Sequence, residues 1–304
     1  MSRWSLPAVT AAAGVLSTMG ALVARRLDRG EEHPLAEHLL VATLATAGTT
    51  AIAVAEWLTP MDRDWPGKDQ GRRTDLTYLL VSGPPTAAAA AVSASVCGTA
   101  LAGVARRRFG RSLWPTAWPL AARVVLALVI SEFVHYWHHR AAHQVGWMWR
   151  FHAVHHSANH MTWTNSLRFH PLDHLTLLSS QSAVLIALGI DRESLVAHSI
   201  FKGIHGQIQH ANLPAGSGPL ALVLSTAEQH RWHHSGSGAT GIVNHGAVLS
   251  LWDRAFGTFY DPPGGRGPAD MGPRCAEEYP QHFVAQLLRP FRSRRSDGRE
   301  LRTR

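Results

Sequence analysis

The chain has 304 residues, with 29 Lys and Arg against 21 Asp and Glu, for a formal net charge of +8. That length predicts one or two domains, and two cysteines exclude a disulfide framework and a cysteine-ligated zinc or iron–sulfur site. Arginines gather at residues 106–111 and in the tail from Arg289, beside apolar stretches. This placement indicates membrane-flanking or solvated charge and no nucleic-acid partner.

Four apolar runs precede residue 135, at residues 6–23, 39–58, 76–104 and 118–134. Each is close to the roughly 20 residues that a membrane-spanning helix needs. Tryptophans stand near their ends, as interfacial anchors do. We therefore expect several membrane helices, although buried helices of a soluble bundle are the alternative. We expect the first run to be an uncleaved membrane anchor, with a cleaved secretory signal as the alternative. The third run is interrupted by Gly83-Pro84-Pro85.

Further along the chain, residues 132–156 and 220–232 have helical patterns. Two apolar stretches between them, residues 175–190 and 195–208, are predicted to form a hairpin. Gly, Ser and Pro make residues 235–241 a loop and residues 262–273 irregular. The tail from Arg289 is predicted to lack regular structure. The fold class expected is all-α, with multi-pass transmembrane helices and a histidine-rich helical cap.

The most informative number is 20 histidines, of which 17 lie within residues 135–245. Nine of them fall into four motifs, which in chain order are one HxxxH, one HxxHH, one isolated histidine and a second HxxHH. The nine are His139 and His143; His152, His155 and His156; His210; and His230, His233 and His234. On a helix, residues three or four apart share a face, so each motif is expected to present its imidazoles together. Nine imidazoles exceed what one ion accepts, so we predict two metals. Imidazole suits Fe, Zn, Cu and Ni, and does not choose among them.

Polar neighbours of these motifs are candidates to orient the imidazoles, because a metal-bound histidine usually donates its other N–H to an acceptor. They are Asn165, Arg168, Asp173, Glu132, Glu228, Asn244 and Asp253. Helix capping before Pro171 is the other interpretation of Asn165 and Asp173. His170 and His205 are possible additional ligands. Histidines outside a repeated frame are read as ordinary polar positions: His135, His138, His160 and His174.

Together these segments resemble the sterol desaturase / fatty acid hydroxylase superfamily, the membrane histidine-rich di-iron oxygenases. The matching pieces occur in the family's order: EFVHYWHHRAAH, WRFHAVHHS, RFHPLD, HANL, TAEQHRWHHS and LWDRAFGTFY. Departures are Glu132 where the family often has Asp, His135 where it often has Tyr, and Asn244-His245-Gly246 for its usual Asn-Tyr-Gly. We expect N-terminal transmembrane helices in residues 1–115, which match the family only as apolar helices. A fatty acid hydroxylase-like catalytic domain is expected in residues 116–262, and a Pro/Gly-rich segment with a basic, disordered tail in residues 263–304.

The resemblance implies an O2-dependent non-haem di-iron enzyme of the bacterial cytoplasmic membrane, with its histidine cap in the cytosol. It would hydroxylate or desaturate an unactivated C–H position of a lipid. It makes the nine histidines of the motifs ligands of two Fe, which zinc may replace on purification. Electrons would come from a separate ferredoxin, cytochrome b5-like protein or reductase. The alternatives are a non-redox membrane protein that binds or transports metal, and a zinc hydrolase.

Overall fold

The computed structural model describes residues 34–63, 71–214, 219–236, 242–261, 268, 271 and 279–292. Across these residues the regular structure is helical, and the extended pairing is limited to two isolated bridges, Leu224 with Leu249 and Ser235 with Met271. The all-α expectation is confirmed. The anchor expected at residues 6–23 lies outside the described residues, as do most of the loop at 235–241 and most of the segment from 262 to 278.

Long apolar helices form the first half of the described chain: α2 (Pro34–Leu58), α4 (Gly83–Phe109) and α5 (Leu120–Gln144). The short helix α3 (Arg72–Thr77) leads into α4 without a break in the helical backbone. Three stretches in the described residues are long and apolar enough to cross a membrane: Val41–Leu58, Arg72–Phe109 and Leu120–Gln144. They coincide with the second, third and fourth apolar runs of the sequence.

The Gly83-Pro84-Pro85 sequence does not divide the third run. A π-helical turn, η2 (Tyr78–Ser82), joins α3 to α4, and Gly83 donates its N–H to the carbonyl of Tyr78. A proline has no N–H and its ring crowds the carbonyl four residues before it. The wider π turn fits both prolines at the start of α4, where missing donors are tolerated. The predicted interruption is therefore a local widening within one helix.

Short helices build the cap around longer ones. In chain order they are α6 (Gly146–His152), η3 (His155–Ser157), η4 (Trp163–Leu167), α7 (Pro171–Leu188), α8 (Arg192–His210), η5 (Pro219–Leu222), α9 (Ala227–His233), α10 (Leu251–Ala255), α11 (Phe283–Leu288) and η7 (Arg289–Phe291). Residues 132–156 are therefore not one helix, and the helix expected at 220–232 begins only at Ala227. The tail expected from Arg289 first forms the helical turn η7.

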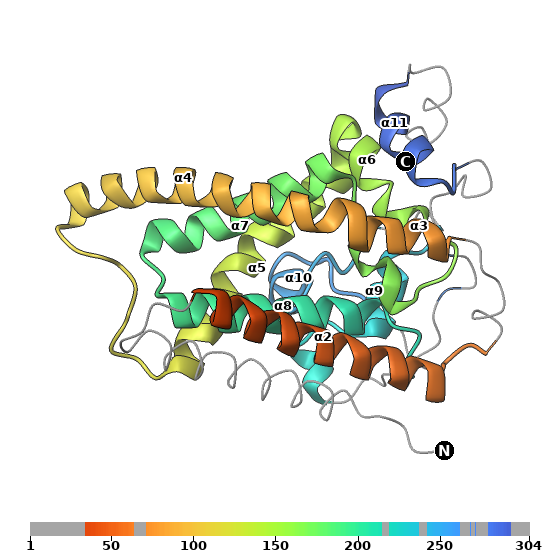
Figure 1. Ribbon diagram of the computed structural model, residues 1–304, viewed down its shortest axis with the longest axis horizontal. Coiled ribbons are helices and arrows are strands. Elements are labelled where there is room, and N and C mark those ends of the chain that lie inside the picture. The colour runs from red at the N-terminus through yellow and green to blue at the C-terminus, as the bar shows by residue number, and fades with distance from the viewer. Residues whose placement is uncertain are drawn as a thin grey trace.

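The helices pack in pairs (Figure 1): α4 lies along α7, and α2 lies along α8. The contact between α2 and α8 is apolar, with Leu44 and Ile52 of α2 against Ile200, Ile204 and Ile208. The predicted hairpin is formed by α7 and α8, because Gly189 ends α7 at φ 87° and the Asp191 side chain caps α8. This packing brings the last turn of α8 to the end of α5, where the histidines gather.

Candidate metal centre

Nine buried or half-buried histidines converge in the described structure, and they are the nine of the sequence motifs. They form two groups, in each of which one ring nitrogen per residue lies within 4.8 Å of the others. We call the first the five-histidine group: His139, His143, His152, His156 and His233. The second is the four-histidine group: His155, His210, His230 and His234. Two groups of this size match two metal ions better than one.

The two HxxHH motifs each divide between the groups, which corrects the expectation that each presents three imidazoles together. His152 and His156 face the five-histidine group, while His155 between them faces the other. In the second motif the division is reversed. His230 and His234 belong to the four-histidine group and His233 to the five-histidine group. Each motif therefore ties the two groups together.

Ring nitrogens that face away from the centre have fixed acceptors. His139 and His233 donate Nδ1–H to the carbonyls of His245 and Val243, at 2.8 Å and 2.7 Å. His210 donates its Nδ1–H to the carbonyl of Gly206 at 2.8 Å. A neutral imidazole that donates from Nδ1 leaves a bare lone pair on Nε2. These hydrogen bonds therefore turn three lone pairs toward the centre.

The inward nitrogens of the five-histidine group fit a metal ion. All five Nε2 atoms are buried and have no hydrogen-bond partner in the protein. An unpaired buried acceptor costs on the order of 1–3 kcal/mol, so five together would be strongly unfavourable. In the four-histidine group, Nε2 of His230 lies 3.1 Å from Nε2 of both His210 and His234. A cation at each centre would bind these lone pairs, and the donor set suits a transition metal.

Burial favours the neutral form of six of these histidines by lowering their pKa, and the neutral form is the one that binds metal. Burial lowers the pKa of His155, His156, His230, His233 and His234 well below the usual histidine range, and neighbouring imidazoles lower it further. The pKa of His210 is lowered by burial to about 4, against the opposing hydrogen bond to Gly206. Deprotonated imidazoles are therefore present at neutral pH without further rearrangement.

Aromatic rings cover parts of both groups. The Phe169 ring stacks on His155, with centroids 4.0 Å apart and planes 17° from parallel. The Trp149 ring lies 5.1 Å from His143 and 5.5 Å from His156. These rings bring apolar surface against the imidazoles and keep water from their edges, which strengthens electrostatic interactions inside the site.

Asp173 is the candidate acceptor that contacts a member of the groups directly. Its Oδ2 accepts the Nδ1–H of His152 at 2.9 Å, and its Oδ1 lies 3.4 Å from Nε2 of His138. Burial raises the pKa of Asp173, but the contacts with His152 and His138 outweigh it and hold that pKa below its usual range. The carboxylate is charged at neutral pH and fixes the ring of His152.

Glu132 and Asp253 contact backbone N–H groups of the segment at residues 243–249, and Asn244 belongs to that segment. Oε2 of Glu132 accepts the N–H groups of Ala247 and Val248 at 2.9 Å and 2.7 Å. The Asp253 carboxylate accepts those of His245 and Gly246 at 2.7 Å and 2.8 Å. Asn244, at φ 54°, donates to the carbonyls of Gln229 and Tyr260. Since this segment carries the carbonyls that orient His139 and His233, these residues act on the site through the backbone.

The remaining candidates lie outside both groups. His170 caps α7, where its Nδ1 accepts the N–H of Leu172 at 3.2 Å. Nε2 of His205 donates to the carbonyl of Ser225 at 2.9 Å. Asn165 donates to the carbonyl of His160 at 2.6 Å, and Glu228 is buried in α9 without belonging to either group. The described structure thus brings neither possible additional ligand to the metal centre.

Two residues near the centre were not singled out in the sequence. Glu56 of α2 accepts the N–H of Trp163 at 3.0 Å and that of Asn212, two residues after His210, at 2.9 Å. Lys202 of α8, which is half-buried, forms an ion pair with the buried Glu132. A carboxylate near the end of an apolar run and a lysine in an amphipathic helix carry no local signal of their partners. Only their long-range contacts define these roles.

An apolar hollow of about 320 Å³ lies on α2 and is lined by Thr49, Thr50, Ala53, Val54, Trp57 and Trp163. None of the nine histidines lines it. It therefore marks no path to the metal centre, and the candidate site rests on the histidine geometry alone.

The fold and site define a helical protein with candidate membrane spans and two buried histidine groups that could hold metal ions. Residues 124–258 match the family model for fatty acid hydroxylase. The chain is 35% identical over 257 residues to "Ornithine lipid hydroxylase OlsE" of Rhizobium tropici, covering 84% of this chain and 76% of that protein. The chain belongs to the fatty acid hydroxylase family, within the sterol desaturase / fatty acid hydroxylase superfamily.

Similarity also extends to alkylglycerol monooxygenases. The Caenorhabditis elegans protein is 30% identical over 155 residues, which are 49% of this chain and 30% of that protein. The human protein is 32% identical over 146 residues, which are 48% of this chain and 32% of that protein. The chain thus spans about a third of the length of these monooxygenases. No solved structure matches the chain.

Proposed function

We propose that this protein is an O2-dependent, non-haem di-iron hydroxylase of a membrane lipid. The observation that carries the proposal is the pair of histidine groups, in which the inward nitrogens of nine histidines converge on two centres. Soluble di-iron bundles use glutamates with histidines, whereas these groups contain imidazoles alone. A relative that covers most of this chain carries the name hydroxylase, which favours redox chemistry over metal transport or hydrolysis.

The lipid class to test first comes from the same relative, whose name specifies an ornithine lipid. Its similarity covers 84% of this chain, a length that must include α3 to α5, among them two of the candidate membrane spans. The alkylglycerol monooxygenases share only about half of the chain, so an ether lipid is the second class to test. We propose hydroxylation and not desaturation, because both kinds of relative are named for oxygen insertion.

In this proposal the nine histidines hold two irons, which would supply O2 activation and oxidation of an unactivated C–H bond. The carbonyls of Val243, His245 and Gly206 and the Asp173 carboxylate orient the rings through their Nδ1–H groups. Phe169 and the other aromatic neighbours keep water from the imidazoles. Buried neutral rings bind a cation without first losing protons.

Electrons would come from a separate protein, because the sequence contains no CxxC or haem-binding motif. A ferredoxin, a cytochrome b5-like protein or a flavin reductase could supply them. Such donors are reduced in the cytosol, so we propose that the end of the bundle with the histidines faces the cytosol.

The test uses full-length protein loaded anaerobically with Fe(II) and assayed with O2, a ferredoxin and its reductase, and an ornithine lipid. We expect two irons per chain and a product carrying one atom from isotopically labelled O2. The variant His210→Ala should lose one iron and most of the activity. The variant His282→Ala, which changes an exposed histidine outside both groups, should retain both.

The alternatives predict different results. Two tightly bound zinc ions in protein purified under anaerobic, iron-rich conditions, with no oxygen incorporation, would favour a transporter or a zinc hydrolase. A product that carries oxygen from water only would exclude monooxygenation. A product with a new double bond and no added oxygen would establish a desaturase.

A further inference from the structure

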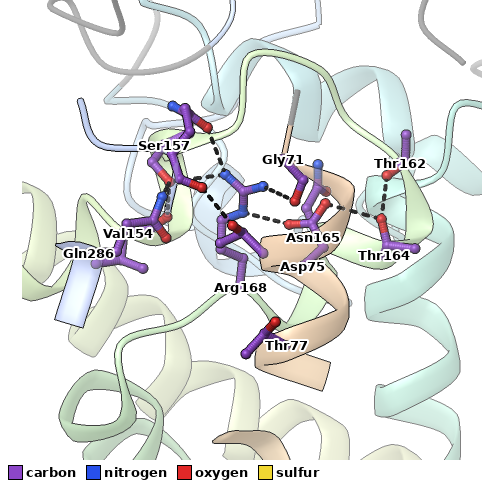
Figure 2. Close-up of polar contacts among 12 residues, drawn as sticks. Gly71, Asp75, Thr77, Val154, Ser157, Thr162, Thr164, Asn165, Arg168 and Gln286 are labelled. Atoms are coloured by element: carbon purple, nitrogen blue, oxygen red, sulfur yellow. Dashed lines mark hydrogen bonds and ion pairs between the residues drawn. The ribbon is translucent and has the colours of Figure 1, made fainter. Parts of the chain in front are cut away.

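A second polar cluster lies behind the metal centre, where the buried side chain of Arg168 joins three parts of the chain (Figure 2). Its Nε donates to Oδ1 of Asp75 in α3 at 2.5 Å, and Nη2 donates to the carbonyl of Gly71 at 3.1 Å. Its Nη1 donates to Oγ of Ser157 at 3.3 Å and to Gln281 at 3.4 Å. Arg168 is 1% exposed, so these contacts replace all of its hydration.

Ser157 is the point at which this cluster reaches the metal centre. It follows His156 directly and ends the turn η3. Its hydroxyl donates to the carbonyl of Val154 at 2.6 Å and accepts from Arg168 and from Gln286 at 3.0 Å. A hydroxyl has one donor and two acceptor sites, so all of them are used. The position of η3 is therefore set from the side that faces away from the metals.

The turn held in this way carries a histidine of each group. His155 belongs to the four-histidine group and His156 to the five-histidine group. A displacement of η3 would move both rings at once. Loss of any other single contact described above, such as that of Asp173 with His152, would affect one group only.

The counter-ion of Arg168 comes from a membrane helix. Asp75 is 4% exposed, and its second oxygen accepts a hydrogen bond from Thr164 at 3.2 Å. A buried guanidinium is favourable only when it is paired and its donors are satisfied. Asp75 lies outside the residues 124–258 that match the family model. The ion pair thus connects a segment beyond the matched domain to a turn inside it.

We propose that Arg168 is a positioning residue for both metal sites, and that Asp75 is required to hold it. In this role Arg168 fixes the turn η3, so that His155 and His156 close their two groups together. The proposal rests on the proposed function only in that the groups bind metal.

The test is a titration of full-length metal-free protein in lipid nanodiscs with Co(II), followed by visible absorption. We expect Arg168→Lys and Asp75→Asn to weaken the binding of both metal equivalents by about 10–100-fold, the range seen when the partners of metal ligands are removed. Lysine keeps the charge but lacks the planar fork that reaches Asp75, Gly71 and Ser157 simultaneously.

The control is another arginine–aspartate ion pair, between the buried Arg123 of α5 and the half-buried Asp191 that caps α8. Arg123 precedes His139 by 16 residues, or about 24 Å along a helix. Arg123→Lys and Asp191→Asn should lower thermal stability and leave Co(II) affinity unchanged. Arg168→Lys protein with wild-type Co(II) affinity, or with only one metal equivalent weakened, would overturn the proposal.

Amide hydrogen exchange on the metal-free proteins separates this proposal from the proposed function. Arg168→Lys should speed exchange at residues 152–160 at least tenfold relative to wild type, and Arg123→Lys should not. If wild-type protein bound no metal, the proposed function would fail, and the exchange result alone would decide whether Arg168 positions η3. Unchanged exchange in Arg168→Lys would refute the positioning role.

Discussion

At the scale of single residues, the allocation of histidines follows from local helix geometry. The turn η3 is a 3-10 helix, in which consecutive residues are about 120° apart, so His155 and His156 point to different groups. In α9, His230 and His234 are four residues apart and share a face, while His233 is turned about 100° from His234. Spacing could therefore predict which histidines gather. It could not predict the division of the first HxxHH motif, because the break between α6 and η3 has no signature in that motif.

Asp173 offers the most direct test of a single contact. Asp173→Asn keeps the size of the side chain but removes the charge that fixes His152. We expect the metal in the five-histidine group to bind about 10–100-fold more weakly, while the four-histidine group is unaffected. Metal titration of the variant measures both affinities. Equal weakening at the two groups, or none, would show that Asp173 does not act through His152.

At the scale of elements, the segment at residues 243–249 is held in place by the carboxylates of Glu132 and Asp253. Glu132 is fully buried, pairs with Lys202 and accepts backbone N–H groups of the segment. Its carboxylate therefore joins α5, α8 and the carbonyls that orient His139 and His233. The sequence suggested Glu132 as a neighbour of the ligands, but the segment between them was not foreseen.

We expect Glu132→Gln to lower the free energy of unfolding by about 1–3 kcal/mol, because it leaves the half-buried ammonium group of Lys202 without its charged partner. Adding Lys202→Met should recover part of that loss, since the double variant buries no unpaired charge. Unfolding in mixed micelles measures the free energies of unfolding of the wild type, the two single variants and the double variant, which form a double-mutant cycle. Losses that simply add, with no recovery in the double variant, would contradict a coupled pair.

The contact between α4 and α7 depends on small residues. Ala90, Ala94 and Gly98 recur every four residues on the buried face of α4, a spacing that lets membrane helices approach closely. A Cβ atom at Gly98 would lie 2.6 Å from Cβ of Ile186 and 2.9 Å from the carbonyl oxygen of Ala183. The same helix contains Gly103, where an added Cβ would meet only the end of the Arg107 side chain at 3.6 Å.

Gly98→Ala should therefore destabilise the protein by about 1–3 kcal/mol, as overpacking does. Gly103→Ala should stabilise it by about 0.5–1 kcal/mol, because alanine favours the helix and has room. The opposite signs, measured by unfolding in the same micelles, distinguish packing from helix propensity. Two stabilising substitutions would contradict the close approach of α4 and α7.

Element boundaries were predicted where the length of an apolar run sets them, and missed where a helix cap or a distant backbone pairing does. The lengths of the apolar runs were sufficient to predict the helices α2, α4 and α5. The start of α9 at Ala227 has a local signal that was overlooked, the capping box of Thr226 and Gln229. The residues before it are extended because Ser225 donates its N–H to the carbonyl of Val248, a distant pairing that no local pattern indicates.

At the scale of the molecule, the basic cluster of α4 and the metal centre lie at opposite ends of the bundle (Figure 1). Arg106, Arg107 and Arg108 form the last turn of α4, a helix of 27 residues or about 40 Å. The following helix, α5, begins near that end and leads to the histidines. If the histidines face the cytosol, the cluster faces the other side, contrary to the usual excess of positive charge in cytosolic loops.

Labelling of introduced cysteines shows whether the histidines or the basic cluster of α4 face the cytosol. Arg108 and Arg292 are both exposed, and Arg292 follows η7, whose Phe291 packs against Phe151 of α6 beside the metal centre. In a background without Cys97 and Cys275, a membrane-impermeant maleimide applied to intact cells should label Arg108→Cys. It should label Arg292→Cys only after permeabilisation, because the proposed cytosolic electron donors require the end with the histidines to face the cytosol. The reverse pattern would place the histidines outside and require a donor there, and labelling of both from one side would contradict the crossing of α4 and α5.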